Sequence, residues 1–196
     1  MKRGKFVVVV APSGSGKNTL IDAAKKAYSE LATLVTCTTR TPRPGEIDGV
    51  HRHFLSREEF DRRIEAGEFL EWAEYGGNRY GTLKSSIEEV LSRGAVLLAD
   101  IEVQGARRLK TLLPKAEFTT IYVEAGGWGT LLNRITGRAP MSEEEIAKRY
   151  ERYLDEITFK PEADYIVDNP DHAQGEAEEA FVALIGRIIS EVHAGV

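Results

Sequence analysis

The chain has 196 residues, of which 42% are hydrophobic and 29% are charged, a composition typical of one globular domain. Its 26 basic and 31 acidic side chains give a formal net charge of −5, which argues against a general nucleic-acid-binding protein. No apolar run approaches the length of about 20 residues that a membrane span needs, and the single cysteine, Cys37, has no partner for an internal disulfide. We therefore expect a cytoplasmic protein that acts without nucleic acid, membrane or an obligate protein partner.

The predicted elements alternate between strands and helices. The run Phe6–Ala11 is short, β-branched and uniformly apolar, which is typical of a strand buried on both faces of a parallel sheet. We expect four later runs to join it, namely Leu34–Cys37, Ala95–Ile101, Phe118–Val123 and Tyr165–Val167. Helices are predicted at Thr19–Ala27, Ser56–Ala66, Leu83–Leu91, Gln104–Leu112, Ser142–Ile157 and Gly175–Val192. This order predicts an α/β domain whose parallel sheet is flanked by helices.

Two intervals interrupt this alternation. Thr38–Tyr80 combines turn sequences with short alternating runs, which predicts a small, partly antiparallel insertion. Ala125–Arg152 is polar and rich in Gly and Arg, a composition that we interpret as a mobile cover. We expect a single domain over 1–196, with a core at 1–35, 83–124 and 153–196, an insertion at 36–82 and a lid at 125–152.

A phosphate-binding loop is predicted directly after the first strand. The chain there reads Ala11-Pro12-Ser13-Gly14-Ser15-Gly16-Lys17-Asn18-Thr19 and enters a helix, close to the pattern G-x-x-x-x-G-K-[ST]. The glycines let successive N–H groups converge on phosphate oxygens, and the helix N-terminus adds positive potential. Lys17 would reach the outer phosphates. A chance lysine in a Gly-rich turn is the alternative, which the strand and helix on either side disfavour.

Two oxygen donors for Mg²⁺ are expected near this loop. Asn18 stands where the pattern has a Ser or Thr whose hydroxyl contacts the metal, and an amide oxygen is also a hard ligand. Asp100 ends an apolar run as the acidic residue of a Walker B strand does, so we expect it to hold Mg²⁺ through water or to face the acceptor. The four histidines show no metal-ligand spacing, and we expect no zinc site.

Arginines are concentrated in the predicted insertion. Arg40 and Arg43 lie three residues apart beside prolines, and Arg52 follows shortly after. Guanidinium groups form bidentate contacts with phosphate oxygens, so the three together suit a phosphate monoester. The alternative is that these are surface arginines paired with Glu46 or Asp48.

Several separated motifs resemble the guanylate kinase family, and the resemblance covers roughly Lys5 to Val192. Besides the phosphate loop, the matching segments are Thr38-Thr39-Arg40-Thr41-Pro42-Arg43-Pro44-Gly45-Glu46, Gly67-Glu68-Phe69-Leu70-Glu71-Trp72-Ala73, Gly77-Asn78-Arg79-Tyr80-Gly81-Thr82 and Asp100-Ile101-Glu102-Val103-Gln104-Gly105. Motifs in the correct order are more specific than any one of them. The resemblance implies a P-loop kinase fold with a GMP-binding insertion and an arginine-bearing lid, which transfers a phosphoryl group from ATP, with Mg²⁺, to GMP or dGMP.

The resemblance also implies roles for individual residues. The loop from Ala11 to Thr19 would bind ATP. Glu71 would accept hydrogen bonds from guanine N1–H and the exocyclic amine, which adenine does not offer at that position. The other residues expected at the GMP site are Arg40, Arg43 and Tyr80 for the phosphate, Thr36 and Thr82 for O6 and the neighbouring ring nitrogen, and Arg52, Asp100 and Glu102.

Two of these positions depart from the family pattern. Arg52 stands where guanylate kinases usually carry a phosphate-binding tyrosine, which preserves a phosphate contact and changes its geometry. Glu102 stands where the family has a second aspartate, and its extra methylene displaces the carboxylate by about one bond length.

Arginines in the predicted lid complete the catalytic set. Arg134 and Arg138 are four residues apart and would share a helix face, and Arg149 lies in the next predicted helix. The resemblance implies that they contact the donor and transferred phosphates, where charge accumulates during transfer. Lys17 and Arg40 join these three as the expected catalytic residues. The alternative is that the lid arginines pair with Glu143–Glu145 on a solvated helix.

Two other functions remain open from the sequence. One is a non-catalytic guanylate-kinase-like binding module, in which Asn18, Arg52 and Glu102 reflect lost activity. The other is a related P-loop phosphotransferase with a different acceptor, which the presence of Glu71, Tyr80 and Thr82 disfavours.

Overall fold

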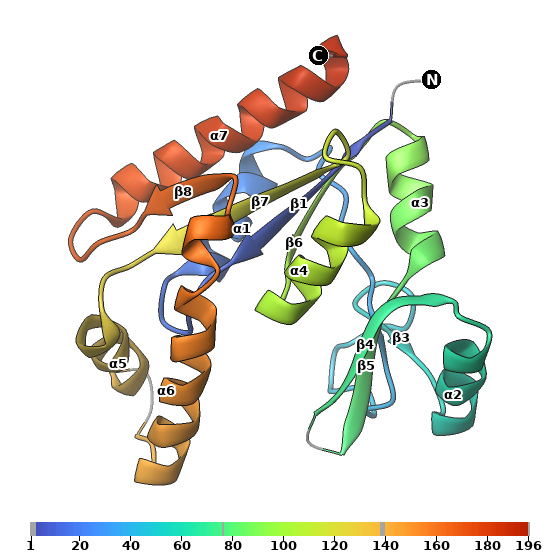
Figure 1. Cartoon of the computed structure of the whole chain (residues 1–196), viewed down its shortest axis with the longest axis horizontal. Coiled ribbons are helices and arrows are strands. Elements are labelled where there is room, and N and C mark those ends of the chain that lie inside the picture. The colour runs from blue at the N-terminus through green and yellow to red at the C-terminus, as the bar shows by residue number, and fades with distance from the viewer. Residues whose placement is uncertain (1–2, 76, 138–139, 196) are drawn as a thin grey trace.

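The structure is a computed structural model that describes residues 3–75, 77–137 and 140–195, and its strands form two four-stranded sheets (Figure 1). The elements are β1 (Lys5–Val10), α1 (Lys17–Ala27), β2 (Cys37–Thr38), β3 (His53–Phe54), α2 (Arg57–Glu65), β4 (Phe69–Tyr75), β5 (Asn78–Leu83), α3 (Lys84–Ser92), β6 (Val96–Asp100), α4 (Val103–Leu112), β7 (Phe118–Glu124), α5 (Trp128–Thr136), α6 (Glu143–Ile157), a 3₁₀ turn (Lys160–Glu162), β8 (Tyr165–Asp168) and α7 (Gln174–Ala194).

The core sheet has the order β6-β1-β7-β8, and all of its pairings are parallel. Side chains of β1 alternate between its two faces, because successive residues of a strand point to opposite sides. Val7 and Val9 pack in the cluster formed with α1 and α7, whereas Phe6, Val8 and Val10 pack in the cluster formed with α3 and α4. Burial on both faces explains the uniformly apolar sequence of β1. The predicted fold class is confirmed.

The second sheet lies in the expected insertion and has the order β3-β2-β5-β4. Its β2–β5 and β4–β5 pairs are antiparallel, and its β2–β3 pair is parallel. It has a small core of its own with α2, in which the rings of Phe60 and Phe69 stack with centroids 4.3 Å apart. Burial there raises the pKa of the Cys37 thiol to about 11, so the thiol stays protonated near neutral pH.

The expectation that Leu34–Cys37 joins the core sheet is wrong. Cys37 pairs instead with Gly81 and His53 in the second sheet, and its side chain is fully buried in that sheet's small core. The segment before it meets the core sheet at one isolated bridge, between Ala32 and Leu97. A short apolar run indicates a strand but does not specify which strand it pairs with.

The six predicted helices are present, with ends within two residues of those expected. Two of these helices begin at a serine cap: the Ser56 side chain accepts from the Glu59 N–H, and Ser142 forms a complete capping box with Glu145. Helix α5 was not among the predicted helices. It packs on α6 through Trp128, whose ring lies 5.1 Å from Tyr150 and 5.4 Å from Tyr153.

In Figure 1, helices α5 and α6 lie at the lower left and the second sheet lies at the lower right. The core sheet and α7 lie above them. The boundaries expected for core, insertion and lid stay a prediction. Within the described residues, no helix is both long and apolar enough to cross a membrane.

Candidate functional site

The predicted phosphate loop connects β1 to α1 in a conformation that depends on glycine. Gly14 and Gly16 have φ angles of 87° and 84°, in the left-handed region that L side chains rarely adopt. A Cβ on Gly16 would lie 2.4 Å from Asn169 Nδ2, so the close approach also requires glycine. Gly16 caps α1, and Lys17 is the first residue of the helix. The loop therefore stands at a helix N-terminus, where backbone N–H groups attract an anion.

The parallel pairing of β1 with β6 places Asp100 beside the phosphate loop. Val9 is the register partner of Asp100, and the Asp100 carboxylate lies 3.3 Å from the Lys17 ammonium. Ala11, the residue that replaces the first glycine of the motif, is buried at the end of β1. Both Asn18 and the Asp100 side chain are exposed, so either can reach an ion in the solvent.

This donor set fits Mg²⁺ better than a tightly coordinated metal. Within the described ranges, no three His, Cys, Asp or Glu side chains gather in a group that could hold a metal ion. Mg²⁺ takes one or two protein carboxylates and fills its other positions with phosphate oxygens and water. Asp100 and Asn18 supply that kind of partial oxygen set next to the phosphate loop.

Asn169, at the end of β8, anchors the phosphate loop and was not predicted as a site residue. It is 4% exposed, and its side-chain amide donates to the Ser15 carbonyl at 2.7 Å. Its own carbonyl accepts from Arg134 at 3.0 Å, and Arg134 also forms an ion pair with Asp171 at 2.8 Å. A buried asparagine held by several hydrogen bonds fixes the position of the groups around it. The sequence contains no local pattern that identifies this contact.

A cavity of about 310 Å³ lies beside this anchor, next to the phosphate loop. Thr19 lines it, so the threonine after Asn18 faces this space. The other residues that line it are Gly14, Gly16, Arg134, Asn169, Pro170, Asp171, His172 and Gln174. A space of this kind at a helix N-terminus suits the nucleoside part of a phosphate-bearing ligand.

The lid arginines contact the phosphate loop. Arg149 of α6 donates to Ser13 Oγ at 2.8 Å, and Arg134 of α5 reaches the Gly14 carbonyl at 3.5 Å. Within the described residues, these two arginines form no ion pair with Glu143–Glu145: Arg134 pairs with Asp171 and Arg149 donates to Ser13, while Glu145 closes the capping box and Glu144 pairs with Lys148. Arg138 lies outside the described residues.

Glu156 of α6 is a further acidic group at this point. Burial and, to a smaller extent, the nearby Glu102 carboxylate raise its pKa, whereas Lys17 and a hydrogen bond from the Ser13 N–H lower it, and the net value is about 7. Glu102 itself precedes α4 as its N-cap residue. Helix α6 therefore brings both a cation, Arg149, and a carboxyl group to the loop.

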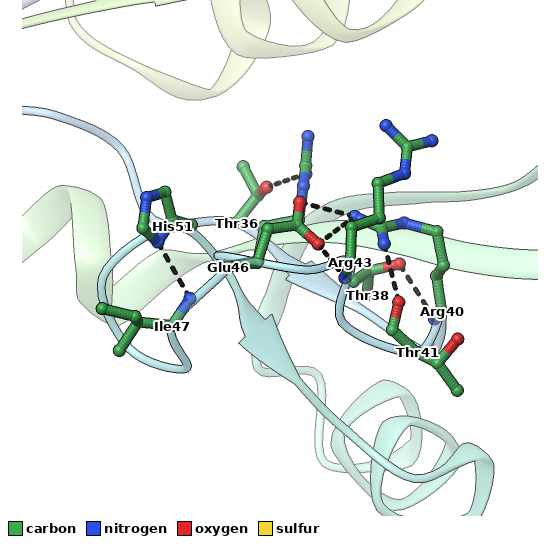
Figure 2. Close-up of polar contacts among 9 residues, drawn as sticks. Thr36, Thr38, Arg40, Thr41, Arg43, Glu46, Ile47 and His51 are labelled. Atoms are coloured by element: carbon green, nitrogen blue, oxygen red, sulfur yellow. Dashed lines mark hydrogen bonds and ion pairs between the residues drawn. The ribbon is translucent and has the colours of Figure 1, made fainter.

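In the insertion, Glu46 links the two arginines of the predicted phosphate site. Its carboxylate oxygens accept from the Arg40 guanidinium at 2.8 and 2.9 Å and from the Arg43 N–H at 2.6 Å (Figure 2). These contacts lower the pKa of Glu46 to about 2. The pairing with Glu46 named above as an alternative is thus present for Arg40. The Arg43 guanidinium donates no hydrogen bond within the described ranges. Glu46 and, to a smaller extent, Tyr80 raise the pKa of the Arg40 guanidinium.

The expected base-reading residues lie on neighbouring strands of the second sheet. Thr82 Oγ1 donates to Glu71 Oε1 at 2.6 Å, across the β4–β5 pair. Arg52 has a different hydrogen-bond acceptor from Arg40, which donates to Glu46. Its guanidinium donates to Thr36 Oγ1 at 2.6 Å and lies over the Tyr80 ring, 5.9 Å from the centroid. The structure thus brings Glu71 to Thr82 and Arg52 to Thr36.

Comparisons with known proteins place the chain among nucleotide kinases. The profile of the guanylate kinase family matches residues 3–180. Guanylate kinase of Rubrobacter xylanophilus is 43% identical over 190 residues, which are 97% of each chain. Guanylate kinase of Clostridioides difficile is 42% identical, over 87% of this chain and 82% of its own. The crystal structure of guanylate kinase from Anaplasma phagocytophilum superimposes with a TM-score of 0.66 at 26% identity, over 95% of this chain and 87% of its own.

Proposed function

The chain belongs to the guanylate kinase family, and we propose that the residues described above carry out phosphoryl transfer from ATP to GMP. The reaction forms a bond between an oxygen of the GMP phosphate and the γ-phosphorus of ATP. It breaks the bond from that phosphorus to the β–γ bridging oxygen, which leaves as part of ADP, and the products are ADP and GDP. Since ATP is the donor, we place the reaction in the cytoplasm.

The donor binds at the phosphate loop. The loop from Ala11 to Thr19 presents its backbone N–H groups to the phosphates, and Lys17 neutralises the outer ones. Asn169 keeps the Ser15 carbonyl turned away from the phosphates by occupying it with a hydrogen bond. The cavity beside Asn169 takes the nucleoside, as its position next to the loop suggests.

Mg²⁺ accompanies ATP, and Asp100 and Asn18 would hold it, directly or through water. When bound, this ion supplies positive charge to the phosphate oxygens of the donor. Lys17, 3.3 Å from Asp100, keeps the carboxylate at this position and contributes a second positive charge.

The acceptor binds in the insertion. Arg40, Arg43 and Tyr80 hold the GMP phosphate, and the Arg43 guanidinium, which donates no hydrogen bond to any residue that the structure describes, is available for it. Glu71 accepts from guanine N1–H and the exocyclic amine, with Thr82 and Thr36 as neighbours. Adenine places an acceptor at N1, so it would leave the Glu71 carboxylate facing a lone pair, which is unfavourable.

The lid stabilises the charge of the transferring group. Arg134, Arg138 and Arg149 come from the region of α5 and α6, and Arg149 already reaches the phosphate loop at Ser13. Cations that close over the phosphates stabilise the transition state and exclude water, which would otherwise take the phosphoryl group. Asp100 and Glu102 complete the GMP site that the family resemblance implies.

A single observation carries the proposal. The core sheet holds a glycine-dependent anion loop with Lys17, and the attached second sheet holds a carboxylate, Glu71, poised by Thr82 at 2.6 Å. A non-catalytic module needs only one of these sites. A phosphotransferase with a non-purine acceptor has no use for the Glu71–Thr82 pair.

An ADP-release assay with GMP, dGMP, AMP, UMP and CMP as acceptors tests the function. We expect turnover with GMP or dGMP and at least about thirtyfold less with AMP, because two unmatched polar contacts at about 1–3 kcal/mol each separate the bases. Equal rates with AMP and GMP would contradict base selection by Glu71. Binding of ATP without turnover of any acceptor would instead favour the non-catalytic module.

A further inference from the structure

Four polar side chains form a continuous row across the second sheet. The β2–β5 register pairs Cys37 with Gly81, and its continuation by one residue sets Thr36 opposite Thr82. Thr82 pairs with Glu71 across β4–β5. On the other side, β3 runs beside β2, and Arg52 directly precedes β3. The row therefore reads Arg52, Thr36, Thr82 and Glu71; the first two directly precede β3 and β2, and the last two lie within β5 and β4.

The hydrogen bonds within this row give it a direction. A guanidinium group donates and never accepts, so in the 2.6 Å contact from Arg52 the Thr36 oxygen is the acceptor. A hydroxyl has one proton, and the Thr36 proton is therefore left to donate elsewhere. At the other end, a carboxylate accepts, so the proton of Thr82 is committed to Glu71 at 2.6 Å. The row presents a donor at Thr36 and acceptors at Thr82 and Glu71.

This direction matches one purine edge and opposes the other. Guanine offers an acceptor at O6 followed by donors at N1 and the 2-amino group, whereas adenine offers a donor at its 6-amino group followed by an acceptor at N1. A free threonine hydroxyl adapts to either edge, because its proton rotates to suit its partner. The bond from Arg52 occupies one of the two acceptor lone pairs of the Thr36 oxygen and turns the hydroxyl proton away from Arg52, so this hydroxyl favours donating to the base over accepting from it.

We propose that Arg52 is a positioning residue for base specificity, which directs the Thr36 hydroxyl proton toward O6 of a 6-oxopurine. The inference rests on the proposed function, since it takes the GMP site to lie over this row. It assigns Arg52 to reading the base, in contrast to the phosphate role expected from the sequence. The Arg43 guanidinium, which has no hydrogen bond within the described part of the chain, is the contrasting case and serves the phosphate.

The affinities for guanosine and for AMP distinguish a role of Arg52 in reading the base from a role in binding the phosphate. Guanosine has the base without the phosphate, and AMP has the phosphate without O6. Both are measured by equilibrium competition against labelled GMP, for wild type, Arg52→Met and the matched control Arg43→Met. Arg52→Met should lower the affinity for guanosine by about threefold to tenfold, which corresponds to the loss of one hydrogen bond. The same substitution should change the affinity for AMP by less than about twofold. Arg43→Met should lower the affinity for AMP and leave the affinity for guanosine unchanged.

A double-mutant cycle tests whether Arg52 acts through Thr36. In a Thr36→Val background, which has no hydroxyl, Arg52→Met should leave guanosine affinity unchanged. The proposal is overturned if Arg52→Met lowers the affinities for GMP and AMP equally without changing the affinity for guanosine. It is also overturned if Arg52→Met still lowers the affinity for guanosine in the Thr36→Val background. Thermal melting of each variant confirms that it is folded. Because these are binding measurements, they are distinct from the proposed function, which fails if wild type does not phosphorylate GMP.

Discussion

The Glu71 carboxylate carries the choice of purine in the proposed mechanism, and its surroundings suit that role. It lies on β4 with one oxygen already held by Thr82, so its second oxygen and remaining lone pairs are directed by that contact. A fixed acceptor discriminates better than a mobile one, because a mismatched base cannot induce it to rotate away.

Glu71→Gln should lower kcat/KM for GMP by about tenfold to a hundredfold, since hydrogen bonds to a charged group are worth about 1.5–3 kcal/mol. ATP affinity should stay unchanged, because the donor site lies in the core. Steady-state kinetics with both substrates varied provide the measurement. Glu74→Gln is the matched control on the same strand, because the Glu74 carboxylate pairs with Arg57 at 3.2 Å. This control substitution should leave kcat/KM for GMP unchanged. Equal losses in the two variants would contradict the prediction.

Asn18 is the residue at which the phosphate loop departs from the common motif. If its amide oxygen is a poor Mg²⁺ contact because the asparagine side chain is longer than that of serine, Asn18→Ser should lower the Mg²⁺ concentration for half-maximal rate by about twofold to tenfold. Asn18→Ala, which has no side-chain oxygen, should raise it. Titration of Mg²⁺ at saturating ATP measures both. A half-maximal concentration that is the same in all three proteins would place the side chain away from the metal.

At the scale of elements, the end of β8 holds the phosphate loop and α5 together. Asn169 reaches the loop at Ser15 with its side chain and α5 at Arg134 with its carbonyl. The donor site thus depends on three segments that are far apart in the sequence. Parallel pairing of β7 with β8 brings them together, through the register Glu124 with Asp168.

Asn169→Ala should raise KM for ATP by about tenfold and lower the melting temperature, because the buried Ser15 carbonyl loses its partner at a cost of about 1–3 kcal/mol. KM for GMP should change by less than about twofold. The adjacent Asp168→Ala is the control, since Asp168 is exposed and leaves the loop contact intact. An unchanged KM for ATP with a lowered melting temperature would show that Asn169 serves stability alone.

At the scale of the whole molecule, the stability of the fold depends on whether the Glu156 carboxyl is protonated, because α6 holds this group partly buried against the core. The charged groups around it are Glu102 near α4, Lys17 in the phosphate loop and Arg152 on its own helix, with the Ser13 N–H as a donor. Its pKa is raised in the folded state, to about 7, so the folded protein holds this proton more tightly than the unfolded chain does.

The free energy of unfolding should therefore decrease as pH rises from about 4.5 to about 7.5, by on the order of 1 kcal/mol after solvent screening. Glu156→Gln, which imitates the protonated form, should remove this component of the slope and be the more stable protein at pH 8. Denaturant unfolding at a series of pH values measures it. If the free energy of unfolding depends on pH in the same way in wild type and Glu156→Gln, a group other than Glu156 is responsible for the pH dependence.

Much of the fold followed from local sequence. The uniformly apolar β1, the capping-box spacing of Ser56 and Glu59, and the glycine loop ending in Lys17 each act through neighbouring residues, so they can be recognised from the local sequence. The same holds for Asp100, whose place at the end of an apolar strand implies a position at the carboxyl edge of the sheet.

The tertiary structure decided what depends on partners distant in the chain. The amino-acid sequence determined that Cys37 lies in a strand, that Arg40 and Arg52 belong to a cationic segment, and that a nucleotide loop precedes α1. Only the fold paired Cys37 with Gly81, joined Arg52 to Thr36, and set Asn169 against Ser15 across more than 150 residues of chain. Local patterns fix backbone conformation and burial through neighbours three or four residues away, whereas the choice of partner depends on how whole elements pack, and that choice decides which side chains meet at the site.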